Sequence, residues 1–409
     1  MSNPWKSSQH FVSPMNYLEE VTSAFVLPKK VKLHDVTLRD GEQETGVALR
    51  KDEKVRIAEL LAEAGINRIE AGMPVVSKQD EQAIREIVKR NLGPEIFGFS
   101  RCIVDDVKLV ADCGVSGVVI EIPSSEHIIE YAYDWPISKA IDLSVKATQA
   151  AHERGLYVVF FTIDATRASL ESLLEIIGKV AAEGHMDGLA LVDTMGAASV
   201  PAIHHYIKKV RAKISKPLEA HFHNDFGLAI ANSLAAVEEG AEVVHTTVLG
   251  MGERSGQAAT EQVALALKLL YAIDTGVRLD RLHGLCRETA RITGHVYPGN
   301  QPVVGSDVFR LESGIPSSWW LKIMDTHPTE VFPYLPSLVG LEEPEVVLGK
   351  GSGTDSVRFW LKRIDRSLDQ AQVVELTALV KEESMSKKGL LNENEFRALV
   401  DGYVGRMGC

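Results

Sequence analysis

Short runs of apolar, often β-branched residues recur along the chain between residues 31 and 248, and amphipathic stretches separate them. The runs lack a clean alternation of apolar and polar residues, which is typical of strands buried on both faces of a parallel sheet. They are VKLHDVTL (31–38), NRIEAG (67–72), EIFGFSR (95–101), GVVIEI (117–122), YVVFFT (157–162), GLALVDT (188–194), LEAHFH (218–223) and EVVHTTV (242–248). The pattern therefore predicts eight parallel strands.

Helical periodicity is clearest at residues 52–63, 137–152, 170–182 and 229–239. Several amphipathic stretches end near a glycine where a left-handed backbone is expected, at Gly65, Gly114, Gly155, Gly184 and Gly240. Eight β-α units within about 240 residues predict an α/β fold, a (β/α)8 TIM barrel, rather than an open doubly wound sheet. Because no GxGxxG follows a strand, the sequence does not favour a dinucleotide-binding domain.

The pattern changes after the helical stretch that ends near Ala272, and prolines and glycines then cluster in VYPGNQPVVG (296–305). We expect three parts: a polar N-terminal arm at residues 1–29, the barrel at 30–290, and a smaller, α-rich C-terminal appendage at 300–409. The last pair of helices is expected between residues 369 and 402.

Composition narrows the class of protein. With 409 residues, 45% of them hydrophobic, the chain can bury a large core. A net charge of −12, from 44 basic and 56 acidic residues, argues against nucleic acid or a membrane surface as partner. Cys102, Cys113, Cys286 and Cys409 form no CxxC pair, which favours reduced thiols and a cytoplasmic location. The polar N-terminus does not resemble a signal peptide, and no run reaches the roughly 18 apolar residues of a membrane helix.

Polar residues gather where the predicted strands end, which is the active-site face of a TIM barrel. His221 and His223 lie two residues apart on one strand, so their side chains leave the same face and can share a metal ion. Asp40 is the natural carboxylate partner, and such ligands suit Mg²⁺, Mn²⁺, Co²⁺ or Zn²⁺. The alternative is a hydrogen-bonded rim without a metal.

Arg39 can share this site only if the first strand has already ended, because neighbours on a strand point to opposite faces. It would then present a cation to an oxygen on which charge develops, and Glu70 could hold its rotamer. A rim salt bridge is the alternative for this pair. Thr194 adds a hydroxyl that could bind a carboxylate, and the glycine-rich segment 250–257 is interpreted as a flexible flap.

Five motifs together make the chain resemble the DRE-TIM metallolyase superfamily, and within it the isopropylmalate, homocitrate and citramalate synthases. They are TLRDGEQ (37–43), IEAGMP (69–74), VDTMG (192–196), HFHND (221–225) and GMGERSGQ (250–257). The resemblance covers roughly residues 30–275 and extends into the appendage through VVGSDVFRLESGIP (303–316) and VVLGKGSG (346–353).

The resemblance implies a Claisen-type condensation, in which a deprotonated acyl-CoA attacks a metal-chelated 2-oxo acid and CoA is released by hydrolysis. By similarity, the metal ligands are Asp40, His221 and His223, with Gln257 in the place of the family's asparagine ligand. Arg39, Glu70 and Thr194 would take the catalytic roles of polarising the 2-oxo group, orienting Arg39 and contacting the acceptor carboxylate. Residues expected to bind substrate are Arg39, Gln43, Arg101, Arg167 and Thr194. A homodimer or larger homo-oligomer is implied as well.

The chain departs from the family pattern where proton transfer is concerned. Leu311 and Pro316 stand where the family has histidines, and Ile163 replaces the first member of an acidic pair. His295, His327 and Glu312 are alternative candidates for the base. Only about 110 residues follow the barrel, too few for the leucine-sensing domain of long isopropylmalate synthases.

Two other functions remain open. A lyase of the hydroxymethylglutaryl-CoA lyase type would run the reverse bond cleavage, but that branch has a cysteine in the glycine-rich loop, and residues 250–257 contain none. A non-catalytic paralogue would use the barrel as a binding module, although the intact ligand trio and Arg39 argue against it.

Overall fold

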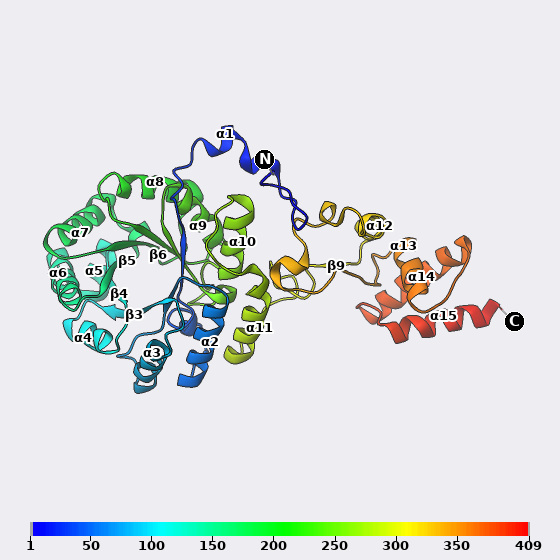
Figure 1. The fold of residues 1–409 in the computed structure, drawn as a ribbon, viewed down its shortest axis with the longest axis horizontal. Helices are drawn as coiled ribbons and strands as arrows, with labels where there is room; N and C mark the ends of the chain where they lie inside the picture. The colour runs from blue at the N-terminus through cyan, green and yellow to red at the C-terminus, as the bar shows by residue number, and fades with distance from the viewer. Residues whose placement is uncertain (1–2, 408–409) are drawn as a thin grey trace. The chain divides into compact units, whose positions relative to one another are not determined.

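The structure is a computed structural model that describes residues 3–407. It contains two compact units, one at Pro14–Tyr297 and one formed by Met1–Ser13 with Pro298–Cys409. In the first unit, eight parallel strands close into a barrel in chain order (Figure 1). They are β1 (Lys32–Asp35), β2 (Arg68–Glu70), β3 (Glu95–Arg101), β4 (Gly117–Pro123), β5 (Tyr157–Ile163), β6 (Gly188–Asp193), β7 (Leu218–Phe222) and β8 (Val243–Thr246). The predicted TIM barrel is confirmed.

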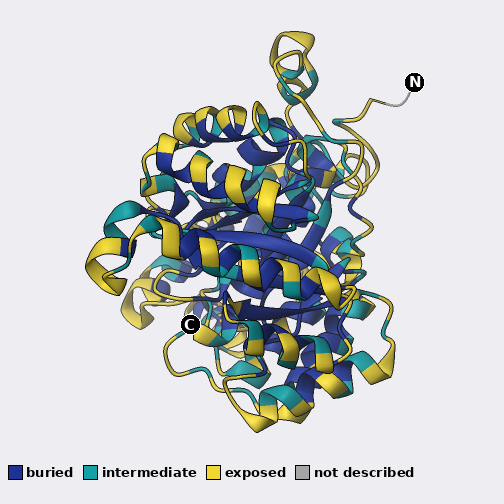
Figure 2. Cartoon of the chain, turned by 90° about the vertical axis from the view of Figure 1, so that its left-hand side faces the viewer, coloured by how far each residue is buried: buried dark blue, intermediate teal, exposed yellow. Residues whose placement is uncertain are grey.

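Helices surround the barrel and turn their apolar faces towards the strands, so buried strands lie inside a shell whose outer faces are exposed (Figure 2). The unit begins with the short α1 (Glu19–Thr22), which buries no side chain. The helices that follow are α2 (Lys51–Glu63), α3 (Lys78–Arg90), α4 (Val104–Asp112), α5 (Glu126–Tyr133), α6 (Ile137–Glu153), α7 (Leu170–Glu183), α8 (Val200–Arg211), α9 (Ala229–Glu238), α10 (Thr260–Leu270) and α11 (Leu282–Thr293). Side-chain caps begin some of them: Ser77 accepts a hydrogen bond from the Asp80 N–H, and Ser169 from the Ser172 N–H. The four helical windows expected from the sequence correspond to α2, α6, α7 and α9.

The barrel interior is apolar on one side and polar on the other. The apolar side comes from the neighbouring strands β3 to β6, through Phe97, Phe99, Val119, Val159, Phe161, Ala190 and Val192. The polar side comes from β7, β8, β1 and β2, which contribute buried charged and imidazole side chains. Such groups are stable in a core only when they pair with one another, so this half of the barrel is where function is to be sought.

Four of the five glycines expected in a left-handed backbone have that conformation, with φ of 79° at Gly65, 81° at Gly114, 73° at Gly155 and 92° at Gly240. The prediction is wrong for Gly184, which has φ −101° and ψ −142°. A Cβ there would lie 2.6 Å from Thr148 Oγ1 and 2.9 Å from the Val180 carbonyl oxygen. Lack of space, rather than handedness, therefore requires this glycine.

The second unit is mainly helical, as expected for the appendage. It contains α12 (Gly314–Ile323), α13 (Thr354–Arg363), α14 (Gln370–Lys387), α15 (Glu393–Met407) and a small parallel sheet of β9 (Arg310–Leu311) and β10 (Glu345–Val346). Its core includes Val357, Trp360, Leu376, Val380 and Phe396. The N-terminal segment joins this unit through an ion pair of 2.6 Å between Lys6 and Glu330. Trp320 is buried, whereas Trp319 is exposed.

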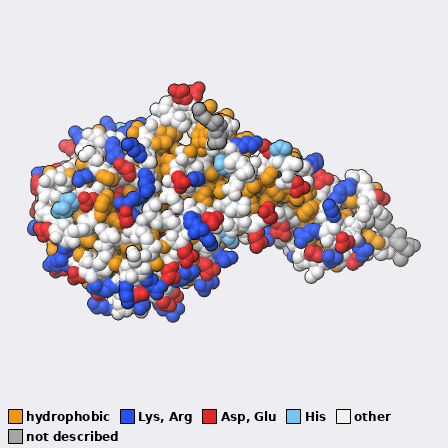
Figure 3. Space-filling view, viewed as in Figure 1, with side chains coloured by type: hydrophobic (Ala, Val, Ile, Leu, Met, Phe, Trp, Pro, Cys, Tyr) orange, Lys and Arg blue, Asp and Glu red, His pale blue; other side chains and the backbone are white. Residues whose placement is uncertain are grey.

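The structure bears on three features that composition raised: membrane-spanning helices, surface charge and the cysteines. Within residues 3–407, no helix combines the length and apolarity needed to cross a membrane. Basic and acidic side chains are interspersed over the barrel face seen in Figure 3. Cys102, Cys113 and Cys286 are free thiols and buried, and Cys409 lies outside the described residues.

Candidate active site

A cavity of about 430 Å³ lies in the barrel unit, where several strands end at their carboxyl side. Six of the residues expected from the sequence line it, namely Arg39, Asp40, Gln43, Thr194, His221 and His223. The rest of the wall is formed by Leu38, Glu42, Val47, Ala48, Lys54, Met73, Val76, Asp80, Phe99, Glu121, Phe161, Ile163, Val192 and Glu253. The cavity thus combines a carboxylate and imidazole cluster with an arginine and an apolar wall.

Three polar side chains converge at one side of the cavity. They belong to Asp40, in the turn after β1, and to His221 and His223, at the end of β7. Asp40 Oδ2 lies 3.4 Å from His221 Nε2 and 3.8 Å from His223 Nε2. Each side chain offers one ligand atom, and these three atoms all lie within 4.8 Å of one another. All three residues are buried. This spacing allows the three atoms to share one cation.

The local backbone explains why these neighbours reach a single site. His221 lies in β7 and His223 follows its last residue, Phe222, in the same extended alternation, so both imidazoles face the interior. β1 ends at Asp35, and the chain turns before the 3₁₀ helix Gly41–Gln43. Because the strand has ended, Arg39 and Asp40 both reach the cavity although they are adjacent in sequence.

The remaining ring nitrogens of the two histidines have partners away from the cavity. His223 Nδ1 lies 3.2 Å from the Gly256 carbonyl oxygen, to which it donates, and His221 Nδ1 lies 3.3 Å from His245 Nδ1. Burial lowers the pKa of His221 well below its usual value, more than Asp40 raises it. Burial would raise the pKa of Asp40, but the hydrogen bond with His221 and the charge of Arg39 hold it below its usual range. Neutral imidazoles and an ionised carboxylate are the forms that bind divalent metals.

Gln257 completes the group. The backbone of Gln257 forms an antiparallel bridge with that of His223, and the side-chain Nε2 donates a hydrogen bond to Asp40 Oδ2. Its Oε1 is buried without a hydrogen-bond partner among the residues described. A half-turn of the amide would bring that oxygen beside the ligand atoms. With the amide turned in this way, two imidazoles, a carboxylate and an amide oxygen would face one point, so the residues present suit the divalent metal that the motifs imply.

Arg39 is held at the cavity wall by an ion pair with Glu70 and by the rings of Phe99 and Phe161. Its Nε donates to Glu70 Oε1, its Nη1 lies 3.2 Å from Gln43 Oε1, and its guanidinium carbon lies 4.1 Å from the centre of the Phe99 ring. Its Nη2 is buried and, within residues 3–407, has no hydrogen-bond partner. A fixed guanidinium with a free donor in a cavity is suited to binding a ligand oxygen.

The other expected residues lie in different surroundings. Thr194 lines the cavity, and its Oγ1 accepts a hydrogen bond of 2.8 Å from the Asp164 N–H. Arg101 and Arg167 are not part of the cavity wall. Arg101 pairs with Asp106 of α4 at 2.7 Å, and Arg167 pairs with Asp164 at 2.7 Å.

Candidate bases outside the motifs also have partners of their own. His295 Nδ1 lies 2.9 Å from Glu44 in the barrel unit, and Glu312 accepts a hydrogen bond of 2.9 Å from the Gly351 N–H in the second unit. His327 precedes the 3₁₀ helix Pro328–Glu330. Leu311 belongs to β9 and Pro316 to α12. His295, the candidate base that belongs to the barrel unit, is not part of the cavity wall.

Lys54 and Glu121 are among the charged residues of the cavity wall that sequence reasoning missed. Lys54 of α2 is buried between Asp80 and Glu42, the latter at 2.5 Å, and lies 3.2 Å from the Leu38 carbonyl oxygen. It therefore ties the turn that carries Arg39 to α2. Glu121 is a lone carboxylate in the apolar strand β4, at the register position of Phe161. That isolated charge was the signal that could have identified it.

Burial raises the pKa of Glu121 to about 7, against the lowering effect of Arg39. Between pH 4.5, the ordinary pKa of a glutamate, and about pH 7, the unfolded chain has lost the proton while the folded protein keeps it. The free energy of unfolding therefore falls as pH rises through this range. Glu121→Gln removes this loss and should make the variant about 2 kcal/mol more stable, relative to wild type, at pH 8 than at pH 5. Urea unfolding at both pH values measures the difference, with the exposed Glu130→Gln of α5 as the control. An equal effect of both substitutions would contradict this account.

The loop at residues 250–257 differs from the flexible flap expected. The Gly256 carbonyl accepts a hydrogen bond of 2.9 Å from the Asn224 N–H, and the Gln257 N–H donates to the Gly250 carbonyl at 3.1 Å. Arg254 pairs with Asp225 at 2.9 Å. The loop is fastened at both ends because its backbone closes on itself and on the end of β7, which fixes the position of Gln257.

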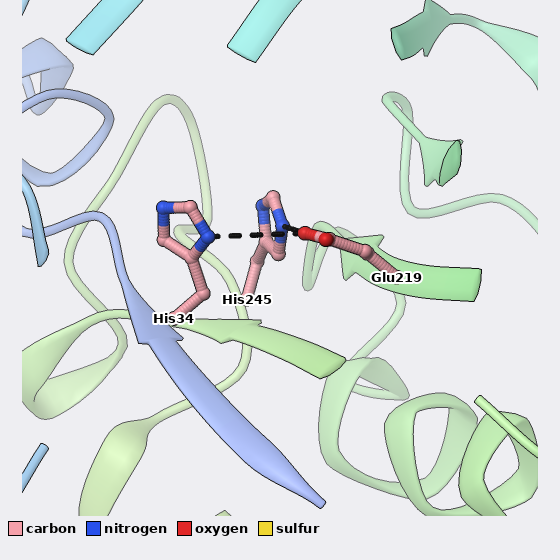
Figure 4. A group of neighbouring side chains, drawn as sticks. All are labelled: His34, Glu219 and His245. Atoms are coloured by element: carbon pink, nitrogen blue, oxygen red, sulfur yellow. Dashed lines mark hydrogen bonds and ion pairs between the residues drawn. The ribbon is translucent and has the colours of Figure 1, made fainter. Parts of the chain in front are cut away.

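Figure 4 shows a second group of three buried polar side chains in the barrel. It lies nearer the amino end of β7 than the first group, because Glu219 stands two residues before His221. His34 of β1, Glu219 of β7 and His245 of β8 are all fully buried. His245 Nε2 lies 2.8 Å from Glu219 Oε2, and His34 Nδ1 lies 3.8 Å from the same oxygen. Arg68 Nη1 lies 2.9 Å from Glu219 Oε1. Burial lowers the pKa of His34 to about 4, so that imidazole is neutral at physiological pH.

Comparison with known proteins agrees with this architecture. Residues 30–287 match the HMGL-like family, and the chain belongs to that family. It is 35% identical over 386 residues to a 2-isopropylmalate synthase of Methanocaldococcus jannaschii, covering 93% of this chain and 73% of that protein. It is 33% identical over 397 residues to the homocitrate synthase AksA of Methanothermobacter thermautotrophicus, covering 97% and 99%. The expected membership of this group of synthases, and with it the expectation of an enzyme, is confirmed.

Among solved structures, the Bacillus subtilis HMG-CoA lyase has a TM-score of 0.60 and 21% sequence identity to this chain. The match covers 66% of this chain and 96% of the lyase. At this identity the likeness concerns the fold, which is the barrel.

Proposed function

We propose that the protein is a divalent-metal-dependent synthase that condenses an acyl-CoA, such as acetyl-CoA, with a 2-oxo acid and releases CoA. The observation that carries the proposal is the cavity in which Asp40, His221 and His223 converge beside the free Nη2 of Arg39. The names of the relatives, which include 2-isopropylmalate synthase and homocitrate synthase, support the reaction type.

Asp40, His221 and His223 would hold the metal, and Gln257 would add its orphaned amide oxygen. When bound there, a divalent ion would supply Lewis-acid stabilisation of the oxygen that becomes an alkoxide. Mg²⁺, Mn²⁺, Co²⁺ and Zn²⁺ are all compatible with oxygen and imidazole ligands.

Arg39 would bind the oxygen of the 2-oxo group through Nη2, because that donor is buried and its other nitrogens are occupied by Glu70 and Gln43. Glu70 acts through Arg39, since its carboxylate fixes the guanidinium against Phe99. Thr194 would donate its hydroxyl hydrogen to the acceptor carboxylate while its oxygen accepts from Asp164. Gln43 would complete the polar wall, and Arg101 and Arg167 would contribute only through rearrangement of their pairs with Asp106 and Asp164.

The proposal includes a cytoplasmic location and a homo-oligomer, since small-molecule CoA chemistry and buried reduced thiols suit the cytoplasm. Size-exclusion chromatography with light scattering measures the oligomeric state directly.

The deciding experiment measures CoA release from acetyl-CoA against a panel of 2-oxo acids: oxaloacetate, 2-oxoglutarate, pyruvate, 2-oxoisovalerate and phosphonate or phosphinate analogues. Each acid is tested with each of the four metals, with excess chelator, and with the Asp40→Asn variant as matched control. We expect metal-dependent release with at least one acid and none with the variant or the chelator. If every acid stays at background with every metal, the condensation proposal fails. Less than about half an equivalent of bound metal in the purified protein would then favour a binding module.

A further inference from the structure

The ligating nitrogens of His221 and His223 face the same carboxylate, yet their other nitrogens are held in different ways. His223 Nδ1 lies 3.2 Å from the backbone carbonyl of Gly256, which can only accept, so the proton of a neutral His223 sits on Nδ1. His221 Nδ1 instead lies 3.3 Å from His245 Nδ1, which can donate or accept. The proton position on His221 therefore depends on what His245 does.

His245 is fixed from below. Its Nε2 lies 2.8 Å from Glu219 Oε2, while Arg68 occupies the other carboxylate oxygen of Glu219 at 2.9 Å. All three are at most 4% exposed. A carboxylate paired with a guanidinium accepts hydrogen bonds, so His245 Nε2 carries its hydrogen. In a neutral His245, Nδ1 is then an acceptor, and the proton shared by the two facing nitrogens sits on His221 Nδ1.

The geometry points to a positioning role for Glu219 and His245: they fix the tautomer of His221 so that its Nε2 presents a lone pair to the divalent cation. This inference rests on the proposed function, because it concerns the metal site of that proposal. It gives both ligating histidines the same arrangement, a proton on Nδ1 and a free Nε2, by two different acceptors. Outer groups of this kind orient ligands and raise their basicity.

The lower group does not suit a metal of its own, although its ligand atoms lie within 4.8 Å of one another. Arg68 is within hydrogen-bond distance of Glu219, so a cation bound there would lie beside a buried guanidinium. Glu219 Oε2 and His245 Nε2 also already bond directly to each other. His34 contacts the same carboxylate, lies 3.6 Å from Glu70 and lies beside the His245 ring, with centroids 4.4 Å apart. Within residues 3–407 it forms no hydrogen bond, ion pair or ring contact with Asp40, His221 or His223.

The experiment titrates the purified protein with Co²⁺ and follows the visible absorption that reports ligand geometry. His245→Leu removes the acceptor and should weaken Co²⁺ binding by about 10- to 100-fold and alter the spectrum. His245→Asn keeps an oxygen near the position of Nδ1 and should restore most of the affinity. His34→Leu is the matched control, since it removes an equally buried imidazole of the same layer, and its affinity should stay within about 2-fold of wild type.

His245→Gln is a second disrupting variant, because a glutamine side chain reaches Glu219 but places no acceptor beside His221 Nδ1. It is used in place of His245→Leu if circular dichroism shows that His245→Leu does not fold. The inference is overturned if His245→Leu or His245→Gln binds Co²⁺ like wild type, or if His34→Leu loses as much affinity as His245→Leu. It is also overturned if wild type binds two equivalents and His34→Leu one, because the lower group would then be a metal site. A wild-type protein that binds no Co²⁺ would instead remove the metal site itself, and with it the proposed function.

Discussion

Replacing His223 with alanine is expected to abolish metal-dependent CoA release while leaving the barrel folded. His223 is 5% exposed and contributes one of the three ligand atoms, and its remaining hydrogen bond is to the Gly256 carbonyl. Losing a Lewis acid worth several kcal/mol corresponds to a fall in kcat of at least about 10³-fold. Steady-state kinetics, metal analysis and circular dichroism measure the three quantities on the same preparation.

His204→Ala is the matched control, because His204 of α8 is partly exposed, pairs with Glu239 at 2.8 Å and is not part of the cavity wall. It should leave kcat and metal content unchanged. Full activity of His223→Ala, or equal losses in both variants, would contradict the assignment of His223 as a ligand.

The second large effect is expected at Arg39. Arg39→Met keeps the length and packing of the side chain against Phe99 but removes the donor, and kcat should fall by about 10²–10³-fold, as for loss of one oxyanion donor. The substitution also leaves Glu70 buried without its partner, which costs about 3–5 kcal/mol of stability. The double variant Arg39→Met with Glu70→Gln should regain that stability but not the activity.

Arg101→Met provides the comparison for this prediction. Arg101 ends β3, is half exposed and pairs with Asp106 outside the cavity wall, so its kcat should change by less than about 3-fold. A loss at Arg101 as large as at Arg39 would mean that Arg101 moves into the site. Thermal unfolding of the single and double variants separates the stability effect from the catalytic one.

The fold could be predicted from the sequence because its signals are local. Eight buried runs separated by helical windows are enough for a closed parallel barrel, and glycines such as Gly65 and Gly240 mark helix ends through their left-handed backbone. Gly184 was misjudged because its reason is the closeness of Thr148, a residue on another helix. A contact between distant segments leaves no mark in the local pattern.

The candidate site divides in the same way. The spacing of His221 and His223 was sufficient to place both side chains on one face, whereas the approach of Gln257 to Asp40 depends on how the glycine-rich loop closes. His245 carries no motif, and it acquires a role in the structure only because β8 lies beside β7. Arg101 was assigned to the site from its place at a strand end, yet its actual partner, Asp106, lies only five residues later in the sequence.

One stretch of chain carries both candidate ligand histidines and the carboxylate of Glu219. Glu219 and His221 occupy alternate positions of β7, and His223 continues the alternation one residue after the strand ends, so the three side chains face the interior together. If β7 slipped by one residue against β6 and β8 during folding, all three would leave the interior at once, and Ala220 and Phe222 would replace them. A barrel closed in that register would still bury apolar side chains in its interior, but it would have no ligands for a cation. On the proposed function, the metal content of a preparation would report how many molecules have paired β7 correctly, which spectroscopic helix and strand content would not reveal.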